Sequence, residues 1–264
     1  QGVIALKPLA VAVPLGPIAK LVIPAGPGLP TAEQAKAAIA LAERIRAEAR
    51  AALITASAAG LDAALDAIDR IAGGAIAGFE AEMKRLLVTR ADYRAEMDAA
   101  QCRRGCAFCC HVDVVATPFE AIRIATSMRG GQIPDRRAAV AEAALPSQAR
   151  GARNTPCPLL VEGACSAYAI RPFACRSLFS SDAKLCELGF AAGAAPGAAV
   201  DVPILSWPRL LSMGYLTGLV AAMRDLGLAA RLIELRAALA LLLADDSAVI
   251  RWLQGDDVFQ RQSG

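Results

Sequence analysis

The cysteines carry the clearest chemical signal in this sequence. All eight lie between residues 102 and 186, and none lies before or after that stretch. They are Cys102, Cys106, Cys109, Cys110, Cys157, Cys165, Cys175 and Cys186. Single free cysteines are usually core fillers, so a cluster of this density indicates a shared task, which we take to be metal or cluster binding. Core thiols or redox disulfides are the alternative, chiefly for the isolated Cys186.

The first four cysteines lie within nine residues, Cys102–Cys110, and two of them are adjacent. Neighbouring cysteines form a disulfide only with strain, whereas all four can converge on one ion or cluster. Gly105 suits the tight turn that such a loop needs. The other four are farther apart, at residues 157–186, so the rest of the domain must fold the loops between them.

Thiolates are ligands for zinc, iron–sulfur clusters and copper(I). His111 is the only histidine, so sulfur must supply nearly all of the ligands, and most hydrolytic catalysis is excluded. His111 itself is either a ligand, a residue behind the ligands or a structural histidine. The packed first set differs from the paired knuckles of zinc sites, which favours an iron–sulfur cluster, a [4Fe–4S] centre, with zinc second. Eight thiolates could fill two sites.

Positive charge is expected near the cysteines, because four thiolates around one zinc ion leave a formal charge of −2. Arg103, Arg104 and Arg176 each lie beside a candidate ligand and are placed to offset it. Arg171 is expected to clamp loop carbonyls, although it could instead hold a carboxylate or phosphate. Glu120 is expected to serve a helix terminus.

Five short motifs resemble those of the CxxCxxCC cysteine-cluster proteins, which are described as zinc- or iron-chelating domains. The motifs are Gly-Cys-x-x-Cys-Cys at 105–110, Thr-Pro-x-Glu at 117–120, Cys-Pro-Leu at 157–159, Cys-Ser-x-Tyr at 165–168 and Arg-Pro-x-x-Cys-Arg at 171–176. The resemblance covers about residues 101–190 and implies that all eight cysteines are metal-directed. It implies no particular activity.

Enzyme function stays open at this point. Flagellin lysine methylases have a similar cysteine cluster, which implies an iron–sulfur centre serving S-adenosylmethionine-dependent methyl transfer, but this chain has no recognisable docking region for a lysine peptide. The spacing Cys102-x3-Cys106-x2-Cys109 also matches the radical S-adenosylmethionine pattern. Residues 80–100 predict helix where such enzymes have a barrel strand, which argues against that class. A third hypothesis is a structural or interaction protein whose loops are tied by zinc.

Composition predicts a mainly α protein. The chain has 264 residues, of which 56% are hydrophobic and only 5% aromatic, and alanine is abundant. A net charge of +3 offers no concentrated basic face, so nucleic-acid binding is excluded. The two most apolar stretches, 202–223 and 226–244, are interrupted by proline or charge, so no membrane span is expected. Because the cysteines have ligand spacing, we expect a cytoplasmic location.

The expected architecture is a helical bundle that carries a loop-rich cysteine module. Its parts are a Pro-rich extended arm (1–30), N-terminal helices (31–100), the cysteine module (101–190) and C-terminal helices that pack with the N-terminal ones (200–264). Helices are predicted over 31–59, 61–71, 75–100, 118–128 and 135–144, and again from Trp207 with breaks near Gly227 and Asp245. The arm either packs on the helices or binds a protein partner.

Overall fold

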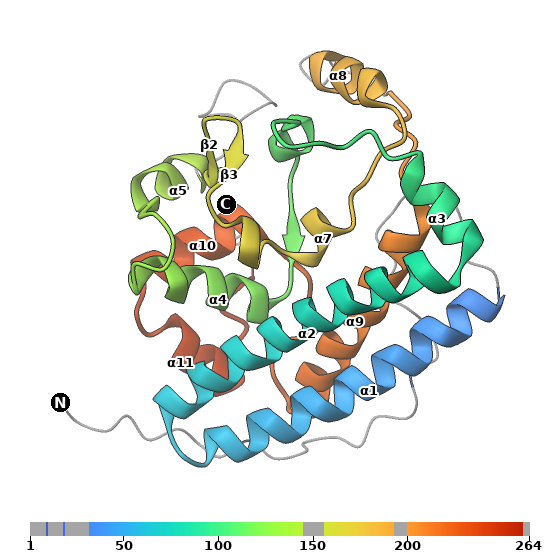
Figure 1. Cartoon of the computed structure of the whole chain (residues 1–264). Coiled ribbons are helices and arrows are strands. Elements are labelled where there is room, and N and C mark those ends of the chain that lie inside the picture. The colour runs from blue at the N-terminus through green and yellow to red at the C-terminus, as the bar shows by residue number, and fades with distance from the viewer. Residues whose placement is uncertain (1–8, 10–17, 19–31, 145–155, 193–199, 261–264) are drawn as a thin grey trace.

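Helices dominate the computed structural model, which confirms the mainly α class (Figure 1). The structure describes residues 9, 18, 32–144, 156–192 and 200–260. The helices are α1 (Ala32–Ser57), α2 (Leu61–Thr89), α3 (Ala91–Asp98), α4 (Pro118–Arg129), α5 (Arg137–Ala144), α7 (Phe173–Arg176), α8 (Ala183–Ala192), α9 (Ser206–Asp225), α10 (Leu235–Ala244) and α11 (Ala248–Leu253), with the 3₁₀ turns η1 (Phe108–His111) and η2 (Tyr168–Ile170). Strand β1 (Val115–Ala116) pairs antiparallel with β4 (Ile233–Glu234), and β2 (Leu160–Val161) pairs antiparallel with β3 (Ala164–Cys165).

The frame of the molecule is built from α1, α2 and α9, which run beside one another in Figure 1. Helices α1 and α9 approach closely because Gly218 of α9 has no side chain: a Cβ there would lie 2.5 Å from the carbonyl oxygen of Ala42. Behind this contact, the guanidinium of Arg46 donates two hydrogen bonds of 2.7 Å to the fully buried carboxylate of Asp225. A buried charge needs such a partner, so this pair fixes α1 against the end of α9.

One predicted break in the helices is wrong. The sequence predicts helices over 61–71 and 75–100 separated at Gly73–Gly74, whereas α2 continues through both glycines. Each glycine inside a helix costs about 1 kcal/mol relative to alanine. Burial of the α2 face that includes Ala72 offsets that cost. The chain breaks instead at Arg90, whose backbone is extended (φ −128°, ψ 112°) before α3 begins.

The other helix predictions are confirmed within a few residues. Helix α1 corresponds to the stretch predicted over 31–59, α4 to 118–128 and α5 to 135–144. After Trp207 the chain is helical, with the expected breaks between α9 and α10 and between α10 and α11. The short strands were not predicted. The pairing of β1 with β4 matters most for the site, because it joins Val115 of the cysteine module to Glu234 of the C-terminal part.

The predicted arm, residues 1–30, lies almost wholly outside the described residues. Of this segment the structure describes Leu9 and Ile18 alone. The Leu9 N–H donates to the Ser57 hydroxyl at 3.0 Å, and the Ile18 N–H donates to a Glu43 carboxylate oxygen at 2.6 Å. Both contacts are made with α1.

Among the described residues, none of the helices combines the length and the hydrophobicity that a bilayer crossing needs.

Candidate metal centre

The cysteines are carried by short elements on one side of the helical frame. In the view of Figure 1, β2, β3, α7 and α8 lie above α2, while α1 lies below it. Cys109 and Cys110 are in η1, Cys165 is in β3, Cys175 is in α7 and Cys186 is in α8. All eight are free thiols. Apart from Cys186 in the ten-residue α8, the cysteines lie in loops or in elements of at most four residues, so tertiary contacts must set their positions.

The first cysteines are placed by two tight turns. Gly105 has a φ of +87°, a conformation open to glycine but strained for other residues, as its position before Cys106 predicted. The Cys106 N–H donates to the Arg103 carbonyl at 3.0 Å, and the Cys110 N–H donates to the Ala107 carbonyl at 2.9 Å. These turns fold Cys106 back toward η1.

Five thiols in and around η1 lie near enough for their charges to act on one another, and we refer to them as the inner thiols: Cys109, Cys110, Cys157, Cys165 and Cys175. A backbone hydrogen bond of 2.6 Å from the Cys157 N–H to the Cys110 carbonyl joins the second cysteine segment to the first. The β2–β3 hairpin then brings Cys165 opposite Leu160. The pKa of the Cys175 thiol is raised, first by burial and then by the charges of three other inner thiols. Cysteines distant in sequence therefore share one small region.

The remaining thiols, Cys102, Cys106 and Cys186, we call the outer thiols. Cys102 accepts a hydrogen bond from the Ser180 N–H at 3.3 Å, and the Gln101 side chain accepts one from the Ala183 N–H at 2.9 Å. These bonds hold the start of α8 against the chain before η1. The pKa of Cys102 is raised by burial and also by the charges of Cys106, Cys109 and Cys186, so Cys109 lies between the outer and inner sets.

The adjacent pair Cys109 and Cys110 shares a hydrogen bond. The Cys110 thiol donates to Cys109, which lowers the pKa of Cys109 to about 7 and raises that of Cys110. Burial raises the pKa of the Cys157 and Cys165 thiols. Metal binding requires thiolates, so the buried inner thiols must release protons when they bind metal.

His111 has a structural place in this arrangement. Its Nδ1 lies 3.1 Å from the Ala107 carbonyl, and its ring packs at 4.6 Å from the ring of Phe190 on α8. Phe108 meets the same ring at 5.8 Å. These contacts join η1 to α8, which positions Cys186 relative to Cys109.

The arginines of the module do not all have the roles expected from the sequence. Arg176, not Arg171, clamps the loop: it is buried and donates to the carbonyls of Arg171, at 2.9 Å, and of Ala169. Its other end pairs with Glu80 of α2. Arg103 and Arg104 are exposed, so their charges are screened by solvent. The guanidinium of Arg171 stacks on the Tyr168 ring at 3.7 Å.

Sequence reasoning missed Arg236 of α10, which is distant from the cysteines along the chain. It is buried, donates to the Val112 carbonyl at 3.0 Å, and its positive charge lowers the pKa of Cys157 in opposition to burial. Asp113 lies 3.5 Å from the same guanidinium but is largely exposed. No local signal in the sequence could have connected Arg236 to the cysteines.

Glu120 serves the helix terminus, as expected. Its carboxylate accepts hydrogen bonds from the Thr117 N–H at 2.7 Å and from the Thr117 hydroxyl at 2.9 Å, and the Thr117 hydroxyl accepts from the Glu120 N–H. This is a capping box at the start of α4. Burial raises the pKa of Glu120.

The spacing of the thiols sets a condition on what they can bind. Across the described residues, which include all eight cysteines, no three cysteine, histidine or acidic side chains are grouped tightly enough to hold a single ion. Four thiolates around one zinc ion stand about 3.8 Å apart, since the Zn–S bond is ~2.3 Å. The donor set of free thiols fits a soft metal, but the described residues hold no preformed tetrahedral site for a single ion.

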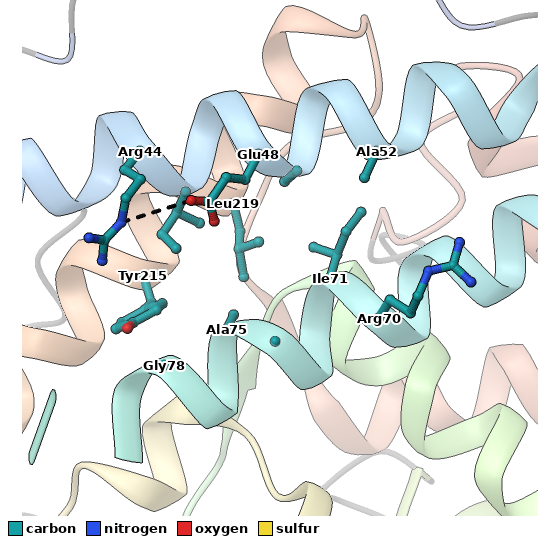
Figure 2. Close-up of a pocket in the computed structure, with 12 residues that line it drawn as sticks. Arg44, Glu48, Ala52, Arg70, Ile71, Ala75, Gly78, Tyr215 and Leu219 are labelled. Carbon is teal, nitrogen blue, oxygen red and sulfur yellow. Dashed lines mark ion pairs between the residues drawn. The ribbon is translucent and has the colours of Figure 1, made fainter. Parts of the chain in front are cut away.

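A cavity of about 340 Å³ lies between α1 and α2, with α9 behind it (Figure 2). Its wall is mostly apolar, with small alanine and glycine residues beside larger aliphatic side chains; Arg44 lies at one end and Arg70 at the other. All of the described residues that line it belong to these three helices, and none is a cysteine. It is therefore not the pocket beside the cysteines that an S-adenosylmethionine-dependent enzyme would need.

Comparison with protein families identifies the cysteine region. Residues 101–188 match the family model CxxCxxCC, described as a "putative zinc- or iron-chelating domain". This confirms the resemblance expected over residues 101–190. No curated protein and no solved structure matches the chain.

Proposed function

We propose that the CxxCxxCC domain of residues 101–188 binds an iron–sulfur cluster through the inner thiols. The family description supports zinc or iron chelation by cysteines. The observation that carries the proposal is the convergence at η1 of five thiols from separate segments, with Cys157 tied to Cys110 through the backbone. Folding brings these thiols together and partly removes them from water, which disfavours their thiolate forms. A shared ligand that binds thiolates would offset this cost.

The packing of the first cysteines along the chain favours a cluster over a single zinc ion. Four thiols lie within the nine residues Cys102–Cys110, a pattern that differs from the paired knuckles usual for zinc. The charges of the inner thiols also act on one another across the domain. Zinc is the second candidate.

The surrounding charges suit an anionic centre. A cluster held by cysteines carries negative charge, and the positive charges of Arg171 and Arg176 act on Cys165 while that of Arg236 acts on Cys157. When bound, a cluster supplies electron transfer or a Lewis-acidic iron. The protein's own residues hold the thiolates, partly bury Cys175 and offset the charge.

We further propose that the outer thiols, with Cys109 between the two sets, provide a second binding position. Cys102 and Cys186 come from opposite ends of the domain and are brought together by the Ser180 and Gln101 hydrogen bonds.

The test is anaerobic purification of the full chain with elemental analysis and a visible absorption spectrum. A cluster gives brown protein that absorbs near ~400 nm, with iron and sulfide in comparable amounts. Colourless protein with stoichiometric zinc would overturn the proposed cluster and identify zinc as the bound metal. Protein with neither iron nor zinc would overturn metal binding altogether.

Two single variants separate the inner and outer sets. Cys175→Ser removes a partly buried inner thiol and is expected to abolish the visible absorption. Cys186→Ser removes an outer thiol and is expected to leave most of that absorption in place. Equal loss in both variants would contradict the division into two sets.

A further inference from the structure

The side chain of Arg171 is incompletely satisfied. Its guanidinium carbon lies 3.7 Å from the centre of the Tyr168 ring, on which it stacks. Its Nε is buried but has no hydrogen-bond partner within the described part of the chain. A buried charged donor without an acceptor is costly, and in native proteins such a donor points to a bound partner such as an ion or a water molecule.

The usual structural explanation for such an arginine does not apply here. An arginine beside a loop commonly clamps backbone carbonyls, but Arg176 already performs that task on the carbonyls of Ala169 and Arg171. Arg176 is in turn held by Glu80 of α2. The backbone from η2 to α7 is therefore fixed without the Arg171 side chain, whose donors are left for another acceptor.

The position of the donor restricts what that acceptor can be. Because the Arg171 Nε is sealed from solvent, an anion that approached from the surface would meet the terminal nitrogens of the guanidinium instead. Inside the module, Arg176 already binds the nearby carbonyls of Ala169 and Arg171, and the thiols are the remaining candidates on which the Arg171 charge acts. The Arg171 charge lowers the pKa of Cys109 and opposes the effect of burial on Cys165, so both thiols lie within its field.

We infer that the Arg171 Nε–H donates a hydrogen bond to a thiolate sulfur of the loaded inner thiols, and that its guanidinium offsets part of the negative charge of the bound centre. The Tyr168 ring acts as a positioning residue, since it holds the guanidinium by cation–π stacking. This inference rests on the proposed function. Residues that hydrogen-bond to the ligands of a metal, without binding the metal themselves, typically change the metal affinity by about 10- to 100-fold.

The experiment compares metal retention with the stability of the metal-free chain. Full-length protein is purified anaerobically with its own iron or zinc, and release of that metal to a chromogenic chelator is timed. In Arg171→Gln we expect release about 10- to 100-fold faster than in the natural chain, because the donor and its charge are lost. Arg171→Lys keeps the charge without the Nε–H and is expected to give an intermediate rate.

Arg104→Gln is the matched control, because Arg104 is also in the cysteine module but is exposed. Its release rate is expected to stay within about twofold of the natural chain, since solvent screens an exposed charge. A release rate in Arg171→Gln equal to that of the natural chain would overturn the inference. So would an equal acceleration in Arg104→Gln, which would indicate a general charge effect.

Denaturant unfolding of the metal-free proteins distinguishes this role from a merely structural one. Arg171→Gln is expected to unfold at the same or a higher denaturant concentration than the natural chain, because the variant loses an unsatisfied donor. A lower midpoint together with faster release would assign Arg171 a structural role and overturn the inference. Natural protein that carries no metal at all would instead disprove the proposed function itself.

Discussion

The buried carboxylate of Glu120 accepts a hydrogen bond of 2.7 Å from the backbone N–H of Phe173. Phe173 is the first residue of α7, the short helix that carries Cys175. The same carboxylate caps α4 through Thr117, so one side chain joins the start of a well-packed helix to the start of a cysteine-bearing one. The position of Cys175 therefore depends on a residue distant from it in the sequence.

Replacing Glu120 should loosen α7. Glu120→Ala leaves the N–H groups of Thr117 and Phe173 buried without an acceptor, which is expected to cost about 2–4 kcal/mol of unfolding free energy. The Cys175 thiol of the metal-free protein should then react faster with iodoacetamide. Denaturant unfolding and mass spectrometry of the Cys175 peptide measure the two effects. Exposed Glu142 of α5 is the control, and Glu142→Ala should change neither.

Cys109 is expected to be the most reactive thiol of the metal-free protein near neutral pH. Its pKa is lowered to about 7 by the hydrogen bond from Cys110, and it is exposed. Because the thiolate is the nucleophile, alkylation of Cys109 should rise through pH 7, while Cys157 and Cys175, whose pKa values are raised by burial, react only at higher pH. Per-residue alkylation measured by tandem mass spectrometry gives the profile.

Cys110→Ala provides the matched test of that cause. The variant removes the donor to Cys109, so the midpoint of Cys109 alkylation should move up toward the ordinary thiol value. An unchanged midpoint would show that another group lowers the pKa of Cys109.

Local features of this protein could be predicted from its sequence. The Thr117–Glu120 capping box and the helix after it depend on residues three or four positions apart, so their pattern is visible in the chain itself. The turn at Gly105 is local in the same way. The cysteine spacing identified the family region because its motifs are short and continuous.

Contacts between distant segments could not be predicted. The exchange of roles between Arg171 and Arg176 depends on where α7 lies against Glu80, and the influence of Arg236 on Cys157 depends on the β1–β4 pairing. Neither of these two long-range relationships leaves a local pattern in the sequence. The continuous α2 was missed for a related reason, because packing against neighbouring helices overrides the low helix propensity of two glycines.

Metal removal is expected to loosen the cysteine domain while leaving the helical frame folded. Helices α1, α2 and α9 pack on one another and carry no cysteine, so far-ultraviolet circular dichroism should change little on chelation. Amide hydrogen exchange should accelerate in residues 156–192, since metal binding is coupled to local folding there. Global unfolding on chelation would instead favour a structural zinc that ties the whole bundle together.

The close contact between α1 and α9 predicts opposite effects for two glycine-to-alanine substitutions in helices. A Cβ at Gly218 would lie 2.5 Å from the Ala42 carbonyl and 2.7 Å from the Ile45 Cβ, so Gly218→Ala must push the helices apart, at a cost of about 1–3 kcal/mol. A Cβ at Gly74 of α2 meets no atom within 4 Å, so Gly74→Ala should stabilise by up to about 1 kcal/mol through helix propensity.

Thermal and denaturant unfolding of the two variants measure this difference directly. Both substitutions raise helix propensity by the same amount, so any difference between them reports the packing of α9 on α1. If Gly218→Ala were as stable as Gly74→Ala, α1 and α9 would have to lie farther apart than the structure places them. The cysteines lie outside both contacts, so the visible absorption of the loaded protein should be the same in the two folded variants.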